Sequence, residues 1–160
     1  MKTAIVTGAA RGIGLATTKQ FLAKGWRVAM VDWDSDELAL SANNLQNVIA
    51  LPYDISQTQD VGRIISGTLK EFGQIAALVN NAGIADFGPI EETDFERWRR
   101  VMSINLDGTF LMSQAASDAL KASKGAIVNI GSISGLRAST LRVAYGTSKA
   151  AVIHLTKQHA

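Results

Sequence analysis

Short apolar runs alternate with helix-like segments along this 160-residue chain, and this alternation restricts the fold more than any other feature. Each run is brief, continuous and rich in β-branched residues, as strands covered on both faces are. A strand that regularly follows a helix predicts an α/β fold with a doubly wound parallel sheet. The predicted strands are residues 3–7, 27–31, 48–51, 75–79 and 126–130.

The intervening segments predict five helices, at residues 13–24, 35–44, 59–72, 94–122 and 145–160. On the first helix, the apolar positions expected on the face that packs on the sheet are Ile13, Ala16, Phe21 and Leu22. The long fourth helix is expected to bend near Gly108, because glycine costs about 1 kcal/mol relative to alanine in a helix interior. No linker or repeat interrupts the pattern, so residues 1–160 are predicted to form a single domain.

Composition limits the classes of partner. Hydrophobic residues at 47% and charged residues at 19% exclude a disordered chain. The net charge of +2 comes from dispersed basic and acidic residues, so we expect no nucleic-acid partner. No apolar run approaches the roughly 20 residues of a membrane span, and nothing resembles a signal peptide, so a cytoplasmic location without membrane contact is expected.

Several reactive side chains carry little chemistry here. The absence of cysteine removes disulfides, thiolate catalysis and cysteine-based metal sites. His154 and His159 are spaced poorly for shared metal ligation on a helix, so no metal site is expected. Trp26, Trp33 and Trp98 are expected to serve packing.

A glycine-rich turn follows the first predicted strand, with the spacing G-x-x-x-G-x-G. Gly8 permits a tight turn, Gly12 lets the backbone approach a pyrophosphate, and Gly14 lets the helix pack closely on the strand. Free backbone N–H groups at the start of a helix favour an anion. Taken alone, the turn fits a plain strand-to-helix connection equally well.

Asp32 ends the second strand about 20 residues beyond this turn, where a carboxylate accepts hydrogen bonds from both hydroxyls of an adenosine ribose. The same carboxylate would repel a ribose 2′-phosphate. Arg11 lies near that site and argues for the phosphorylated cofactor instead. Because Asp32 would occupy the volume of the 2′-phosphate itself, we expect NAD(H) to be preferred and NADP(H) to be the less favoured cofactor.

Tyr145 and Lys149 lie four residues apart at the start of the last predicted helix, so both project from one face. A phenol has an ordinary pKa of about 10, so acid/base work near neutral pH needs a positive neighbour, which Lys149 supplies. Ser132 follows the fifth strand. The carboxyl ends of parallel strands are where doubly wound sheets bind ligands, so Ser132 and the glycine turn are expected at one edge.

Together these features resemble the short-chain dehydrogenase/reductase family over all 160 residues. The matching positions are residues 7–14, Asp32, Asp54, residues 80–83, Asn105, Ser132, Tyr145 and Lys149. The resemblance implies a Rossmann-like fold with strand order 3-2-1-4-5. It also implies an NAD(P)(H)-dependent oxidoreductase that interconverts a small-molecule alcohol and a carbonyl by hydride transfer.

By this resemblance, Tyr145 is the general acid/base and Ser132 hydrogen-bonds the same substrate oxygen. Lys149 would bind the nicotinamide ribose and assist the tyrosine, while Asn105 would hold a water that links the lysine to solvent. Asp54 resembles the family's adenine contact. The residues implied in cofactor binding are Gly8, Arg11, Gly12, Ile13, Gly14, Asp32, Asp54, Ile55, Asn81, Ala82, Gly83, Tyr145 and Lys149.

Family members usually run to about 250 residues in one α/β domain, so the chain corresponds to roughly their first two-thirds. The family's sixth and seventh strands are then absent, together with a segment that covers the substrate. This leaves residues 126–130 as an edge strand that invites pairing. We therefore expect a homo-oligomer or a marginally stable chain.

Two other functions fit part of the sequence. A non-catalytic dinucleotide-binding fragment explains the glycine turn and Asp32 without turnover. A methyltransferase with another adenosine cofactor also explains a glycine turn and an acidic residue, but it leaves Ser132, Tyr145 and Lys149 without a role.

Overall fold

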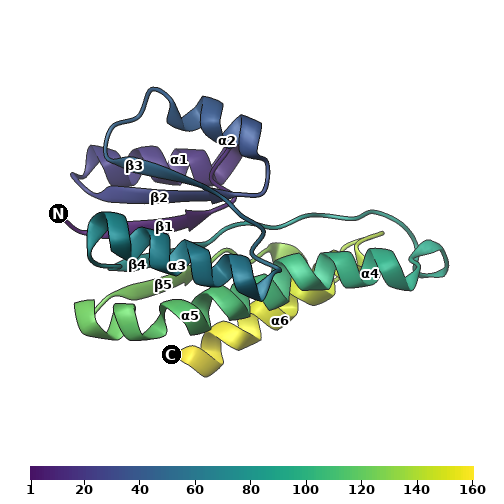
Figure 1. Ribbon diagram of the computed structural model, residues 1–160. Coiled ribbons are helices and arrows are strands. Elements are labelled where there is room, and N and C mark those ends of the chain that lie inside the picture. Colours follow the sequence, from purple (N-terminus) through teal and green to yellow (C-terminus); the bar gives the residue numbers. More distant parts are fainter.

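A computed structural model describes residues 1–160 and contains one parallel sheet of five strands in the order β3-β2-β1-β4-β5 (Figure 1). The predicted doubly wound α/β fold and strand order are confirmed. Each strand pairs in parallel with its neighbours. The strands are β1 (Thr3–Thr7), β2 (Arg27–Asp32), β3 (Val48–Pro52), β4 (Ala77–Asn80) and β5 (Ala126–Asn129).

Helices cover both faces of the sheet. They are α1 (Gly12–Ala23), α2 (Ser35–Ala42), α3 (Thr58–Phe72), α4 (Phe95–Met102), α5 (Gly108–Ser123) and α6 (Val143–His159). Helices α1 and α2 pack over one face, where Val6 and Met30 are fully buried. Helices α3 and α5 pack over the other face, around Ile5 and Leu78. Adjacent residues of β1 therefore enter opposite cores, as strand geometry requires.

The contact face of α1 differs in part from the predicted one. Phe21 and Leu22 are partly buried against the core, as predicted. Ile13 is 65% exposed and Ala16 is also exposed, whereas Gly14 and Thr18 are buried. The expectation for Ile13 and Ala16 is wrong because α1 begins so close to β1 that only a residue without a side chain fits. A Cβ atom on Gly14 would lie 2.0 Å from the carbonyl oxygen of Gly8.

The predicted long helix over residues 94–122 is three segments. Helix α4 runs into a π-helical turn (Ser103–Asp107), and α5 follows. The irregularity precedes Gly108, which itself continues in helical geometry. Gly108 is needed instead for packing, because a Cβ atom there would lie 2.7 Å from the Ile55 side chain.

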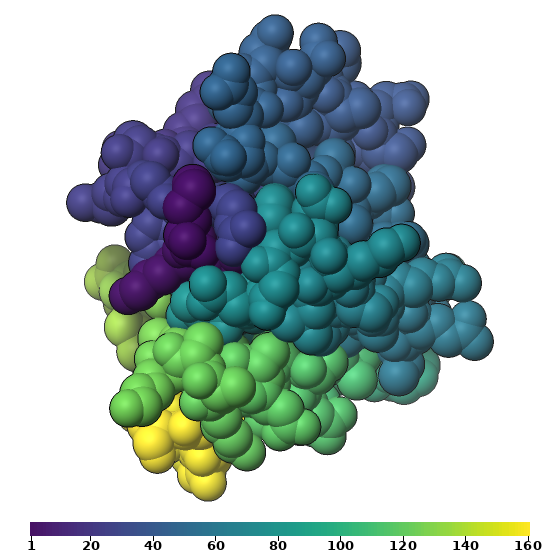
Figure 2. All heavy atoms as spheres, turned by 60° about the vertical axis from the view of Figure 1, so that its left-hand side comes forward, coloured from purple at the N-terminus to yellow at the C-terminus, as the bar shows by residue number.

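Strand β5 forms one edge of the sheet, and Val128 on it is half exposed. In Figure 2 the end of α6, in yellow, lies beside the end of α5, in green. A cavity of about 630 Å³ is lined by α5, from Phe110 to Lys121, together with β5 and the end of α6. The homo-oligomer expected from this edge stays a prediction. None of the helices combines the length and the apolar character that crossing a membrane requires.

Truncating Leu78 tests the central packing. Leu78 is fully buried between β1 and β5, so Leu78→Ala is expected to lower the free energy of unfolding by about 3 kcal/mol. Leu40→Ala is the matched control, because Leu40 is 72% exposed and its loss should cost less than about 0.5 kcal/mol. Urea denaturation followed by circular dichroism measures both. Equal losses would contradict this account of the core.

Candidate functional site

A cavity of about 490 Å³ lies at the carboxyl ends of β1, β2, β3 and β4. This edge is where doubly wound sheets bind ligands. Eight of the predicted cofactor residues line the cavity: Gly8, Arg11, Asp32, Asp54, Ile55, Asn81, Ala82 and Gly83. The sheet therefore gathers segments that are distant in sequence around one hollow.

The glycine turn forms one wall of this cavity. Gly8 and Gly12 have φ values of +64° and +55°, a region that favours glycine. A Cβ atom on Gly8 would lie 2.9 Å from the Cα atom of Ala82, so the turn approaches the chain after β4 at backbone distance. The space around Gly12 is open, since nothing lies within 4 Å of a Cβ atom built there. This side of the turn leaves room for a ligand close to the backbone.

Asn81, directly after the neighbouring strand β4, holds the glycine turn in place by hydrogen bonds. Its Nδ2 atom donates to the carbonyl oxygens of Thr7 at 2.9 Å and Gly8 at 3.2 Å. The Thr7 hydroxyl oxygen accepts from the backbone N–H groups of Asn81 and Ala82, both at 3.0 Å. The Asn81 side chain thus holds the wall of the cavity in shape.

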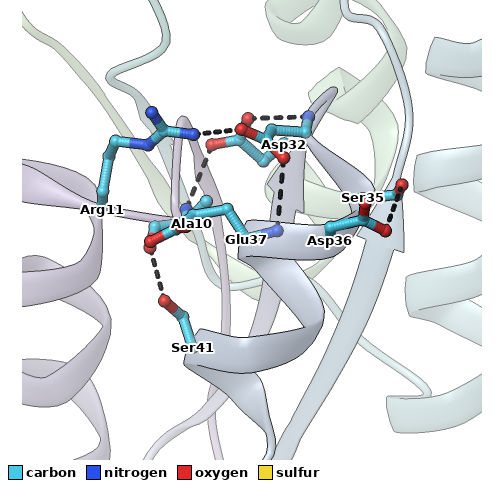
Figure 3. A network of polar contacts seen from close by, with 8 residues as sticks. Ala10, Arg11, Asp32, Ser35, Asp36, Glu37 and Ser41 are labelled. Carbon is cyan, nitrogen blue, oxygen red and sulfur yellow. Dashed lines mark hydrogen bonds and ion pairs between the residues drawn. The ribbon is translucent and has the colours of Figure 1, made fainter.

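Asp32 lies at the end of β2 with its carboxylate against the same turn. One oxygen accepts from the backbone N–H of Ala10 at 3.1 Å, and the other accepts from the N–H of Asp34 at 3.2 Å (Figure 3). Ser41 of α2 donates to the Ala10 carbonyl oxygen at 2.5 Å. A carboxylate has about four acceptor positions, so Asp32 keeps capacity for two further donors, such as neighbouring hydroxyls.

The Arg11 guanidinium forms an ion pair with Asp34 instead of facing the cavity as a free cation. Sequence analysis missed Asp34, although its place two residues after Asp32 was a usable signal. It also missed Trp33, which is 73% exposed and lines the cavity. The expectation that Trp33 serves packing is wrong, because β2 has ended there and the side chain lies outside both cores.

Asp54 and Ile55 follow β3 on the far wall. The Asp54 carboxylate accepts from the backbone N–H of Ser56 at 2.9 Å, which fixes a tight turn. Ile55 is buried against α5 at Gly108. Tyr53 also lines this wall, again without having been anticipated.

Tyr145 and Lys149 form a second group beside the cavity. Tyr145 is half buried on α6, and the Lys149 Nζ atom lies 5.9 Å from the centroid of its ring. Lys149 is buried and donates to the Ile130 carbonyl oxygen at 2.7 Å. Burial lowers the pKa of Lys149 below its ordinary value of 10.5. The predicted pairing of a phenol and an ammonium on one helical face is present.

Ser132 begins a short 3-10 turn (Ile133–Gly135) that lies against α6. A Cβ atom on Gly135 would lie 2.6 Å from the backbone carbon of Lys149, so the turn and the helix touch. The Ser132 hydroxyl oxygen accepts from the N–H of Ser134 at 3.2 Å. Ser132 is therefore carried on a segment that packs directly against the turn of α6 bearing Lys149.

Asn105 is buried in the π-helical turn and connects the cavity wall after β4 to the helix that carries Tyr145 and Lys149. Its Oδ1 atom accepts from the Ile84 N–H at 2.8 Å, and Nδ2 donates to the Ile84 carbonyl at 2.9 Å and to the Ser148 hydroxyl at 3.0 Å. Its Oδ1 atom and the Lys149 Nζ atom lie 3.2 and 3.6 Å from the Cβ position of Gly83. Asn105 thus fixes the chain after β4 to α6. Its expected hold on a water stays a prediction.

Comparison with known proteins gives matches to one family over nearly the whole chain. The sequence profile of the family described as short chain dehydrogenase matches residues 2–160. The chain is 38% identical to 2-(S)-hydroxypropyl-CoM dehydrogenase 3 of Xanthobacter autotrophicus, over 97% of this chain and 63% of that protein. It is 37% identical to galactitol 2-dehydrogenase of Agrobacterium fabrum, over 99% of this chain and 63% of that protein.

A solved structure agrees with the fold. A short chain dehydrogenase/reductase from Burkholderia phymatum in complex with NAD superposes with a TM-score of 0.95 at 29% identity. The match covers 99% of this chain and 58% of that one. The chain therefore spans about 60% of the length of these proteins.

The buried Lys149 predicts a pH dependence of stability. The unfolded chain keeps the lysine proton up to about pH 10.5, whereas the folded chain releases it at lower pH. Wild-type stability therefore gains from rising pH between the lowered pKa and 10.5. Lys149→Met lacks this gain, so its stability relative to wild type should fall as the pH rises toward 10.5.

Chemical denaturation at several pH values measures this difference. Lys157→Met is the matched control, because Lys157 is exposed on the same helix and its substitution should change the free energy of unfolding by less than about 0.5 kcal/mol. A pH-independent difference for Lys149→Met would contradict the assigned burial of the charge.

Proposed function

Because the chain belongs to the short-chain dehydrogenase family, we propose that it is an oxidoreductase that interconverts a small alcohol and a carbonyl, with NAD(H) as its preferred cofactor. The observation that carries the proposal is the buried Lys149 ammonium beside Tyr145, across Gly83 from the cavity. The similar proteins named above are dehydrogenases of hydroxyl compounds, which supports an alcohol as the substrate class. We also propose that the 160 residues act as one dinucleotide-binding domain.

The cavity has the features that a dinucleotide needs. The open backbone at Gly12 and the start of α1 suit a pyrophosphate, since helix N-termini favour anions. The remaining acceptor positions of Asp32 suit two ribose hydroxyls. Gly83 leaves space beside Lys149 for the second ribose. The Burkholderia protein, with NAD bound, has the same fold and supports this placement.

Charge at the adenosine end favours NAD(H) over NADP(H). Asp32 and Asp34 both line this part of the cavity, and a 2′-phosphate would place further negative charge beside them. Arg11 is the nearby cation, and Asp34 already pairs with it. Beside Asp32 and Asp34 the site therefore offers acceptors for hydroxyl groups, and the arginine next to them is already paired.

In the proposed reaction a bound nicotinamide would supply or take up the hydride, and side chains of the protein would transfer the proton. The Tyr145 phenol transfers a proton to or from the substrate oxygen. The Ser132 hydroxyl donates a hydrogen bond to the same oxygen and holds it in position. Lys149 places a positive charge beside the phenol, where it stabilises the negative charge that develops when the proton leaves. Asn105 bonds Ile84, the residue after Gly83, to Ser148 of α6, and so fixes α6 relative to the wall of the cavity.

The cofactor preference can be tested at Asp32. We expect wild type to bind NADH more tightly than NADPH. Asp32→Ser should lower the dissociation constant for NADPH, divided by that for NADH, by roughly tenfold, equal to about 1.4 kcal/mol. Fluorescence titration measures both constants. Asp36→Ser removes an exposed carboxylate from the first turn of α2 and should leave the ratio unchanged. A wild-type chain that binds NADPH more tightly would overturn the preference.

The role of the phenol can be tested separately. Tyr145→Phe is expected to lower the rate of NADH oxidation with a panel of carbonyl compounds by at least about 100-fold, because it removes the proton donor. NADH affinity should stay nearly unchanged. Thr147→Ala removes an exposed hydroxyl from the same helix and should retain the activity. Wild-type NADH binding without any turnover would instead support a non-catalytic dinucleotide-binding protein.

A further inference from the structure

The ion pair between Arg11 and Asp34 lies at the end of the cavity where the proposed site receives the adenosine ribose. Both residues line the cavity together with Asp32. Figure 3 shows Arg11 reaching across from the glycine turn toward the start of α2. A guanidinium is the preferred side chain for a phosphate, because its planar donors match phosphate oxygens. What holds this guanidinium therefore bears on the choice of cofactor.

Asp34 is fixed in place independently of Arg11. Its Oδ1 atom caps α2 by accepting from the backbone N–H of Glu37 at 3.2 Å. Its own backbone N–H donates to Asp32 at 3.2 Å. The second carboxylate oxygen, Oδ2, pairs with Arg11. A carboxylate already oriented by a helix cap loses little freedom when it binds a cation, so it competes well for the guanidinium.

We infer that Asp34 is a specificity-determining residue that withholds Arg11 from a ribose 2′-phosphate. This inference rests on the proposed dinucleotide site. Asp32 acts directly, because its carboxylate occupies the place where the 2′-phosphate would lie. Asp34 acts through Arg11, because it pairs with the guanidinium beside Asp32 that would otherwise neutralise that phosphate. Selection against NADP(H) then has two separable parts.

The size of the Asp34 effect follows from exposure. The Arg11 side chain is 63% exposed and that of Asp34 is 33% exposed, so solvent screens the pair. Releasing Arg11 should therefore improve NADPH binding relative to NADH by about three- to fivefold, and the gain should shrink at high salt.

A double-mutant cycle separates release of Arg11 from simple loss of a negative charge. Asp34→Asn removes the charge but keeps an oxygen that can accept from Glu37, so the helix cap is retained. It is compared with Arg11→Gln and with the double variant. The ratio of the dissociation constants for NADPH and NADH is measured for each by fluorescence titration, and Asp36→Asn serves as the charge control.

When Arg11 is present, Asp34→Asn is expected to lower this ratio three- to fivefold. In the Arg11→Gln background the same substitution should lower the ratio by less than about twofold. An equal fall in both backgrounds would overturn the inference, because it would show direct repulsion alone. So would no fall in either.

Arg11→Gln alone gives a second test that leaves the cap of α2 untouched. Since Asp34 withholds Arg11 in the wild type, this variant should change the ratio by less than about 1.5-fold. A large loss of NADPH affinity would show that Arg11 already serves the phosphate and would overturn the inference. If wild type binds neither cofactor, the proposed function itself fails. If NADH binds but the ratios do not couple, only the role of Asp34 fails.

Discussion

The Thr7 hydroxyl joins the ends of β1 and β4, and the site on this edge of the sheet depends on that junction. Its oxygen accepts from two successive backbone N–H groups, those of Asn81 and Ala82, and it donates to the Val79 carbonyl at 3.3 Å. Asn81 returns two bonds to the carbonyls of Thr7 and Gly8. The fully buried hydroxyl is thereby satisfied, which a buried polar group requires. The same bonds set the distance between the glycine turn and the segment that leads to Gly83.

This junction explains why the glycines are needed where they are. With β1 and β4 held at backbone distance, a side chain on Gly8 would meet Ala82, and one on Gly14 would meet Gly8. Packing within the protein alone therefore requires glycine at positions 8 and 14, independently of any ligand. Gly12 is different, because the space around it at the start of α1 is open, and the N–H groups of a helix N-terminus favour an anion.

Much of this arrangement was predictable from local sequence patterns. Apolar runs gave the strands of a parallel sheet, and the four-residue spacing of Tyr145 and Lys149 put both on one face of α6. The features that were missed depend on packing between distant segments. The π-helical turn around Asn105 forms where two helices and the chain after β4 meet. Glycine is needed at position 108 because the Ile55 side chain packs against it. The hydrophobic periodicity of a single helix does not predict such contacts between distant segments.

The α1 face and the surroundings of Asp32 escaped prediction for related reasons. The buried positions of α1 include glycine and threonine, so hydrophobic periodicity is weak there and Ile13 was a poor guide. The strand end correctly identified Asp32, but the pairing of Arg11 with Asp34 depends on how α2 leaves the sheet. A residue's charge is readable from sequence, whereas its partner is fixed by the fold.

The carboxylates at one end of the site and the ammonium at the other end are stabilised in different ways. At the end near the glycine turn, the carboxylates of Asp32 and Asp34 accept from backbone N–H groups and an arginine at the surface, where solvent limits the cost of their charge. At the other end, Lys149 is buried and bonded to the Ile130 carbonyl, with no carboxylate to neutralise it. Burial of an uncompensated ammonium opposes folding. The neighbouring strand offsets part of that cost, because Ile130 itself donates to Asn80 of β4 at 3.0 Å and so holds the accepting carbonyl in place. The position of the ammonium beside Tyr145 is therefore set by the sheet as well as by α6.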